Sequence, residues 1–151
     1  MADEIRQIVV DRVIERLRTI AGVHVVEDMP SGDIDDNRLP ALAVYDLGQR
    51  PTGNHSYPAQ EFAHTVNVEG YVSARGGGSN GGAAARCAAN ALYGDVVRAL
   101  MADPSLAGAA QSIEEGELAF DIARLANRRS LGFVLRLNIV SHAYLTDPSK
   151  S

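Results

Sequence analysis

The clearest structural pattern in this chain lies in residues 61–100, which read EFAHTVNVEGYVSARGGGSNGGAAARCAANALYGDVVRAL. Apolar residues and His64 alternate with polar residues from position 61 to 74, a period of two that is typical of a strand with one buried face. Residues 75–82 are rich in glycine, which loses too much backbone entropy in regular structure. Small and apolar residues then recur at helical spacing in residues 83–100. This segment therefore predicts a long strand, a glycine loop and a helix that covers the sheet.

The same periodicities place the other elements. An amphipathic helix is predicted for residues 3–20, with Gly22 as its stop. Further strands are predicted for residues 23–27, 39–47, 110–122 and 131–144, and loops for residues 29–38, 48–59 and 124–130. A bulge is expected near Gly116. The order α-β-β-β-α-β-β predicts a single two-layer α+β domain over residues 1–145 and a polar tail at 146–151. Its two amphipathic helices would pack on a mostly antiparallel sheet of about four to five strands, with sequential strands paired by hairpins.

The composition limits the classes of function. The chain has 151 residues, about one domain, of which 46% are hydrophobic and 22% charged. No apolar run approaches the ~20 residues that span a bilayer, and the acidic start of the chain argues against a signal peptide. The net charge of -5 argues against a dedicated nucleic-acid-binding protein, because phosphate contacts need a basic face. The single cysteine, Cys87, lies on the apolar stripe of the second predicted helix, which predicts a buried side chain.

The acidic loop at residues 29–38 imitates the opening of a calcium-binding loop. Asp33, Asp35 and Asn37 have the spacing of the first ligands of such a loop. However, Arg38 stands where glycine is required, and Val44 stands where the bidentate glutamate is required. A solvated loop is therefore the preferred interpretation, and cation binding shared with a neighbouring chain stays open.

The glycine loop between a strand and a helix has the setting in which backbone amides bind phosphate. A Walker-type loop needs Lys followed by Ser or Thr after its last glycine, but Gly82 is followed by Ala83. A dinucleotide site also needs a βαβ unit, and no clear one is predicted. A small anion- or nucleotide-binding domain that uses Gly76 to Gly82 is kept as the less favoured alternative.

The sequence contains no pattern that indicates catalysis, a metal or a cofactor. The histidines are far apart and lack metal-binding spacing: His24, His55, His64 and His142. There is no Gly-x-Ser-x-Gly elbow, and the carboxylate pairs lack an apolar pocket that would separate their pKa values. Aromatic residues make up only 5% of the chain, too few for a platform that stacks single-stranded nucleic acid. We therefore expect a protein that is not an enzyme.

With no catalytic or cofactor site indicated, a surface for assembly is the functional feature that the sequence still suggests. The acidic loop contrasts with a basic turn at residues 124–129, and opposite charges on separate patches suit a head-to-tail, ring-forming interface. Ordinary solvated loops are the alternative interpretation. The candidate interface residues are Asp33, Asp35, Asp36, Gln49, Arg50, His55, Tyr57, Arg75, Asn80, Arg124, Arg128 and Arg129.

The chain also resembles a known family over nearly its whole length and in the order of its elements. The segments that carry the resemblance are residues 5–23, 39–45, 97–108, 113–117 and 131–144. They resemble the tail terminator proteins of long-tailed phages. This family is similar to the minor tail protein that caps the tail tube of lambda-like phages, and it has relatives in prophages and gene transfer agents.

The resemblance implies a non-enzymatic structural protein of the virion tail, assembled in the host cytoplasm. It implies a homohexameric ring that stops polymerisation of the tail tube protein and presents the surface for head-tail joining through the connector proteins. DNA would pass through the lumen without specific binding, and no membrane would be involved. Another neck or head-completion protein of the same particle is the closest alternative.

Overall fold

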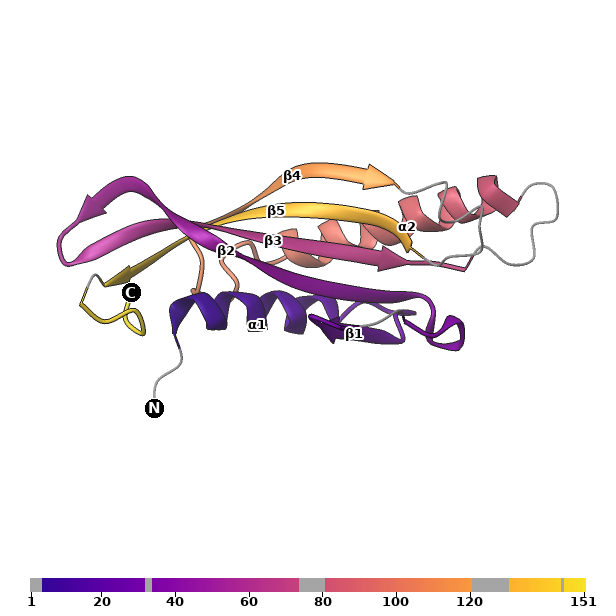
Figure 1. The fold of residues 1–151 in the computed structure, drawn as a ribbon, viewed down its shortest axis with the longest axis horizontal. Helices are drawn as coiled ribbons and strands as arrows, with labels where there is room; N and C mark the ends of the chain where they lie inside the picture. The colour runs from indigo at the N-terminus through magenta and orange to yellow at the C-terminus, as the bar shows by residue number, and fades with distance from the viewer. Residues whose placement is uncertain (1–3, 32–33, 74–80, 121–130, 145) are drawn as a thin grey trace.

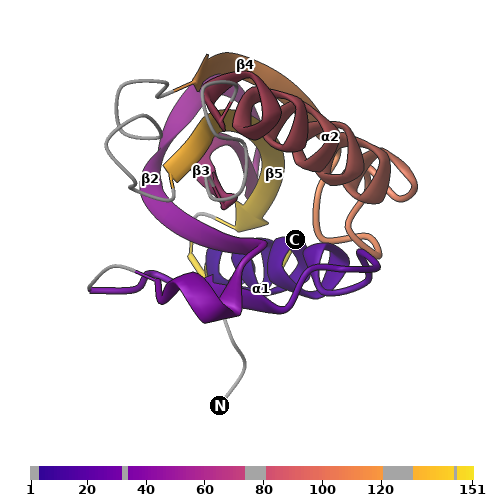
Figure 2. The same ribbon diagram turned by 90° about the vertical axis from the view of Figure 1, so that its right-hand side faces the viewer.

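A five-stranded sheet runs along the molecule, and two helices lie against one of its faces (Figures 1 and 2). The computed structural model describes residues 4–31, 34–73, 81–120, 131–144 and 146–151. The helices are α1 (Ile5–Leu17), α2 (Gly81–Met101) and the short 3-10 helix η1 (Asp36–Arg38). The strands are β1 (Val25–Asp28), β2 (Ala41–Ser56), β3 (Ala59–Tyr71), β4 (Ser112–Phe120) and β5 (Leu131–Tyr144). The α+β class and the predicted order of elements are confirmed.

The strands lie in the order β1-β2-β3-β5-β4. All neighbouring pairs are antiparallel except β1 and β2, which run parallel with Val25 opposite Ala41. The expectation that sequential strands pair by hairpins is therefore wrong for β1 and β2, and also for β3 and β4, which β5 separates. Because the two strands run parallel in this register, β2 starts beside the start of β1.

The core lies between the helices and one face of the sheet, as the alternation predicted. His64, Val66 and Val68 of β3 are buried on this face, beside the alternate residues of β5 from Phe133 to Ile139. Gly70 is required here, because a Cβ at this position would lie 2.1 Å from Cε1 of the fully buried Phe133 ring. The expected interruption at Gly116 is confirmed by a register shift between Glu115 and Leu118.

The predicted apolar stripe of α2 is confirmed at Leu92, Val96 and Leu100, but in the first half of the helix a different set of alanines is buried. Its buried residues are Ala85, Ala89, Leu92, Val96 and Leu100. Cys87 is exposed, so the prediction that it is buried is wrong. The first half of α2 carries alanines on every side, and small residues distributed in this way do not define a buried face. The sheet therefore decides which of them are covered.

The predicted loop at residues 48–59 is also wrong. β2 continues to Ser56, and a two-residue turn at Tyr57 and Pro58 leads directly into β3. The sequence shows no apolar alternation here because this part of the hairpin extends beyond α1 (Figure 1), and neither apolar cluster of the described residues includes a side chain from residues 50–58. Other boundaries shift by a few residues; α1, for example, ends at Leu17 rather than at residue 20.

A smaller apolar cluster lies on the opposite face of the sheet. Ile34, from the connection between β1 and β2, packs with Ala41, Ala43 and Tyr71. The connection is thus partly anchored, although Asp35 beside it is exposed. At the other end, the C-terminal segment docks beside α1, since the Ile5 amide donates to the Pro148 carbonyl at 3.0 Å.

Candidate assembly surface

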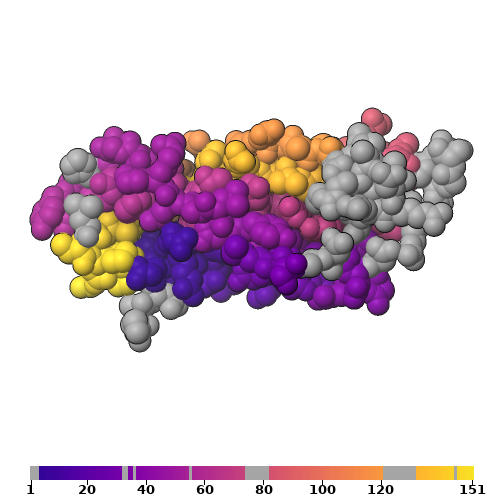
Figure 3. Space-filling view, in the orientation of Figure 1, coloured from indigo at the N-terminus to yellow at the C-terminus, as the bar shows by residue number. Residues whose placement is uncertain are grey.

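Residues 50–61, here called the hairpin arm, project from one end of the molecule (Figures 1 and 3). The arm joins the ends of β2 and β3, with Ser56 opposite Ala59. The last residues of β5 lie along its other side, with Tyr144 opposite Ala59. In the space-filling view the arm and the C-terminal segment together form this end of the molecule (Figure 3).

Polar side chains brace the arm from within. Glu61 accepts hydrogen bonds from Thr52 Oγ1 at 2.7 Å and from Asn54 Nδ2 at 3.1 Å. These two hydrogen bonds lower the pKa of the Glu61 carboxyl from its ordinary value. Gln60 Nε2 also donates to the Asn54 carbonyl at 3.1 Å, across the hairpin. The arm therefore has an internal scaffold that does not depend on a hydrophobic core.

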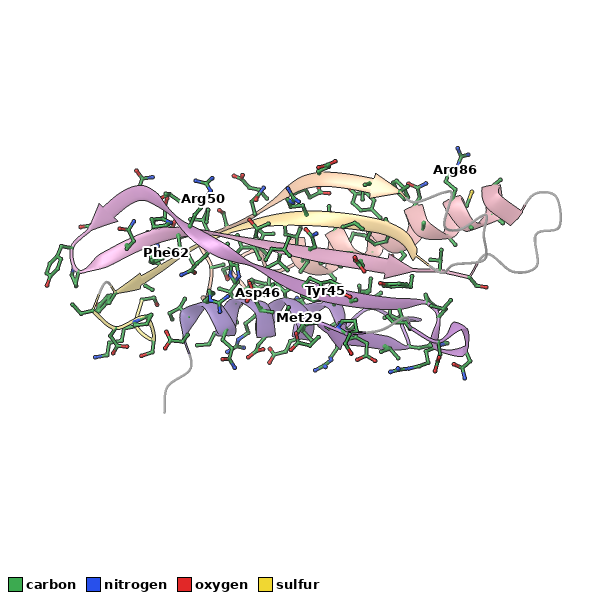
Figure 4. All side chains as sticks on the ribbon, viewed as in Figure 1. Met29, Tyr45, Asp46, Arg50, Phe62 and Arg86 are labelled. Carbon is green, nitrogen blue, oxygen red and sulfur yellow. The ribbon has the colours of Figure 1, made fainter. Side chains whose placement is uncertain are left out.

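The tip of the arm presents an aromatic side chain to solvent. Tyr57 is 76% exposed, the largest exposed fraction among the large hydrophobic residues that the structure describes. Arg50, at the root of the arm, is also exposed and points away from the helices (Figure 4). An exposed aromatic ring on a braced hairpin is typical of a contact residue.

A charged network fixes the root of the arm. Asp46 accepts from Arg6 at 2.6 Å and from the Gly48 amide at 2.9 Å, and it pairs with His64 Nε2 at 2.8 Å. The network sits at the register shift between Asp46 and Gln49 and connects α1 to the sheet. Partial burial raises the pKa of Asp46, but the hydrogen bonds from His64 and Gly48 outweigh it, so the net shift is downward.

His64 itself is fully buried in this network. Within the described part of the chain, its Nδ1 atom has no hydrogen-bond partner. Because an ionised carboxylate only accepts hydrogen bonds, the Nε2 atom of His64 carries a hydrogen and donates the hydrogen bond to Asp46. The histidine is thus a structural link between the sheet and the root of the arm, beneath α1.

The sheet has an open strand edge on each side. β1 pairs only with residues 41–44 of β2, so among the described residues no strand covers β2 from Asp46 to Ser56. Leu47 and Met29 are each 52% exposed beside this edge. On the other side, β4 has only β5 as a strand neighbour in the described ranges. Open edges carry unpaired backbone groups that can pair with another strand.

The two edges differ in charge. Glu114, Glu115 and Glu117 are exposed on β4, and Glu115 also accepts a hydrogen bond from the Tyr93 hydroxyl. On β2 the exposed charge is Arg50, because Asp46 is already paired with Arg6 and His64. The two edges can therefore attract each other, whereas two copies of the β4 edge would repel.

The structure places the sequence-predicted interface residues in separate regions. Gln49, Arg50, His55 and Tyr57 lie on β2 and the hairpin turn, at the end opposite to Asp35 and Asp36. The remaining candidates lie outside the described residues: Asp33, Arg75, Asn80, Arg124, Arg128 and Arg129. Most of the glycine loop, residues 74–80, and the basic turn, residues 121–130, are likewise outside them, so the contrast between acidic loop and basic turn stays a prediction.

Sequence reasoning missed the two open edges and the braces of the arm. A mixed polar run such as residues 49–56 gives no strand signal, although the Tyr57-Pro58 pair marks a turn. Edge positions depend on which strands become neighbours, and β4 is an edge only because β5 inserts between it and β3. The exposed glutamates of β4 were the signal that could have indicated an edge strand.

Other kinds of site find no support among the described residues. In these ranges no group of three His, Cys, Asp or Glu side chains could hold a metal ion. No helix in the same ranges is long and apolar enough to cross a membrane. No protein-family model matches the chain, and no curated protein sequence is significantly similar to it.

Proposed function

We propose that this protein is a structural subunit of a virion tail, a tail terminator that assembles into a ring on the tail tube. The observation that carries the proposal is the pair of open edges, β2 and β4, on opposite sides of one sheet. Because their charges are opposite, each edge fits the other better than it fits itself. Such a contact is head-to-tail, and it closes into a ring when the rotation between subunits allows.

The resemblance to phage tail terminators supplies the biological role. The ring, a hexamer by this resemblance, caps the tail tube, stops polymerisation of the tube protein and joins the connector of the head. The protein is then not an enzyme, and it acts in the virion tail after assembly in the host cytoplasm. The net charge of -5 favours passage of DNA, because a basic lumen would retain the phosphates.

Light scattering during size-exclusion chromatography tests the assembly. We expect a particle whose mass is a multiple of the 16.1 kDa chain. Arg50→Glu should weaken the assembly, because it places a negative charge opposite the acidic β4 edge. Adding Glu114→Lys should restore the assembly, because the two edges then carry opposite charges again, with the signs exchanged. Glu15→Lys on the exposed side of α1 is the matched control and should leave the mass unchanged. A strict monomer at high concentration would contradict a ring.

Particles that lack the protein test the role. A missing terminator should give overlong tails, because nothing stops the tube from growing. Tails of normal length that fail to join heads would instead indicate a neck or head-completion protein. Purified protein added to polymerising tube protein should shorten the tubes, and the Arg50→Glu variant should do so less.

A further inference from the structure

We propose that β1 acts as a stop that sets how neighbouring subunits pair. In the resulting junction, β4 of one copy lies antiparallel along the free part of the β2 edge of the next copy, shifted by four residues toward the hairpin arm. The junction deepens the proposed function and rests on it, because it gives the direction and the register of the contact between the two edges. The register in turn decides which side chains of the two edges meet.

The direction of the contact follows from the strand directions within one chain. β2 runs antiparallel to β3, β3 to β5, and β5 to β4, so β2 and β4 run in opposite directions. In a ring whose axis runs roughly along the strands, rotation from one copy to the next keeps these directions. The β4 edge of one copy therefore meets the β2 edge of the next in antiparallel orientation, which is the more stable form of strand pairing.

β1 closes the first part of the β2 edge to a neighbour, because it already pairs with residues 41–44. Phe120, the last residue of β4, is level with Leu42 across the sheet, through their partners on β5 and β3. A neighbour without a shift would therefore place Phe120 where β1 lies. An even shift keeps both faces of the sheet continuous, and the smallest even shift that clears β1 is four residues. This shift brings Phe120 opposite Asp46.

The free part of β2 and the whole of β4 have the same length along the sheet. From Asp46 to Ser56, β2 lies along the eight residues 59–66 of β3. β4 lies along the eight residues 133–140 of β5. At a shift of four residues, β4 therefore fills the β2 edge from the end of β1 to the hairpin turn. In this stretch of β2 only Pro51 lacks an amide hydrogen for the ladder.

The shift also has the size that a closed sheet requires. Each copy adds β2, β3, β5 and β4 to the continuous sheet, a width of about 19 Å at the usual strand spacing. A shift of four residues is about 13 Å along the strands. Together these lengths tilt the strands by roughly 35° from the ring axis, whatever the number of copies, and the strands of β-barrels tilt by about 35–45°. A register set by β1 is thus compatible with closure.

The register brings complementary side chains together on the face of the sheet opposite the helices. Arg50 and Glu114 project from this face, because their ladder partners on β3 and β5 alternate with buried residues. Across the junction, Arg50 lies opposite Glu117, at the register shift of β4, and Glu114 is its diagonal neighbour. Leu47 lies opposite Ala119. All five side chains are exposed in the single chain, so the contact would cover them.

Disulfide cross-linking tests the register. A chain that carries Cys87→Ser, Leu47→Cys and Ala119→Cys should form a series of disulfide-linked oligomers under mild oxidation. A disulfide within one chain is excluded, because β3 and β5 separate the two positions by roughly 14 Å. The comparison chain carries Glu114→Cys in place of Ala119→Cys. Position 114 would face Leu47 only in a ring without the shift, so this chain should give no such series.

Charge reversal tests the same register without cysteines. Arg50→Glu and Glu117→Lys should each raise the dissociation constant between subunits by about threefold or more, and the double variant should restore it. Without the shift, Arg50 would face Ser112 and lie far from Glu117, so the double variant would then be weaker than either single variant. Arg50→Glu with Glu15→Lys, on the exposed side of α1, is the matched control and should stay as weak as Arg50→Glu alone. Sedimentation over a dilution series gives the constants.

The outcomes separate this register from the proposed function. Cross-linked oligomers from the Glu114→Cys chain, alone or together with those from the Ala119→Cys chain, would overturn β1 as a stop. An assembly of unchanged mass that gives no cross-linked oligomers in either chain would overturn the strand junction and leave a ring held by other contacts. A protein that is monomeric even without substitutions would overturn the ring itself.

Discussion

Two regions of the same β-hairpin are stabilised by different forces. Beneath α1 and α2, one face of β2 and β3 is buried in the core, and Val44, Val66 and Val68 are fully buried. In the hairpin arm none of the described helices covers the strands, and side-chain hydrogen bonds onto Glu61 hold them together. The core half is expected to carry the free energy of folding, while the arm half presents a surface.

The largest expected difference in stability is between the substitutions of two leucines in the same sheet. Leu137→Ala, in the core half, should lower the free energy of unfolding by about 2–5 kcal/mol, because it leaves a cavity beside fully buried neighbours. Leu47→Ala, on the open edge of β2 where the side chain is 52% exposed, should cost less than about 0.5 kcal/mol. Urea denaturation measures both. Equal costs would contradict the division between the buried face of the sheet and its open edge.

The next effect concerns the close approach of β3 and β5. Gly70→Ala should cost about 1–3 kcal/mol, because its Cβ would overlap the Phe133 ring in a core without space to relax. Phe133→Leu in the same chain should make Gly70→Ala less costly. A double-mutant cycle in denaturant gives the coupling, and strictly additive costs would show that the two residues do not compete for space.

A third effect lies at the boundary between the two regions. Asp46→Asn should cost about 1–3 kcal/mol near neutral pH, because it weakens the hydrogen bonds with Arg6 and His64. The pKa of Asp46 is lowered on folding, so its stabilisation is present above its ordinary value of 3.8 and lost as pH falls through the lower folded value. Thermal unfolding between pH 2 and 6 should therefore depend less on pH in the variant. If the variant lost stability at low pH as steeply as the wild-type protein does, this role of Asp46 would be contradicted.

The smallest effect on global stability is expected in the arm. Thr52→Ala removes one brace of Glu61 and should change the free energy of unfolding by less than about 0.5 kcal/mol. Hydrogen exchange of amides in residues 50–61 should nevertheless become faster, because the arm opens locally without unfolding the core. Thr19→Ala, whose hydroxyl bonds only within the turn after α1, is the matched control. Unchanged exchange in the arm would show that the bracing is not needed.

The sequence predicted the covered half of the molecule well and the uncovered half poorly. The alternation in β3 and β5 and the bulge near Gly116 match the structure because burial imposes a period of two on one face. The arm has no such constraint, so residues 48–59 had the composition of a loop. Gln49, Arg50 and Tyr57 were nevertheless named as candidate contacts, and each is exposed on or beside the arm.

Local pattern by itself therefore determined the elements, their order and the core faces of the central strands. Tertiary structure decided which strands became neighbours: β1 runs parallel to β2, and β5 separates β3 from β4. These long-range pairings created the open edges, the projecting arm and the exposed Cys87, because exposure depends on what packs nearby rather than on residue type. The surface proposed for assembly is a product of those pairings.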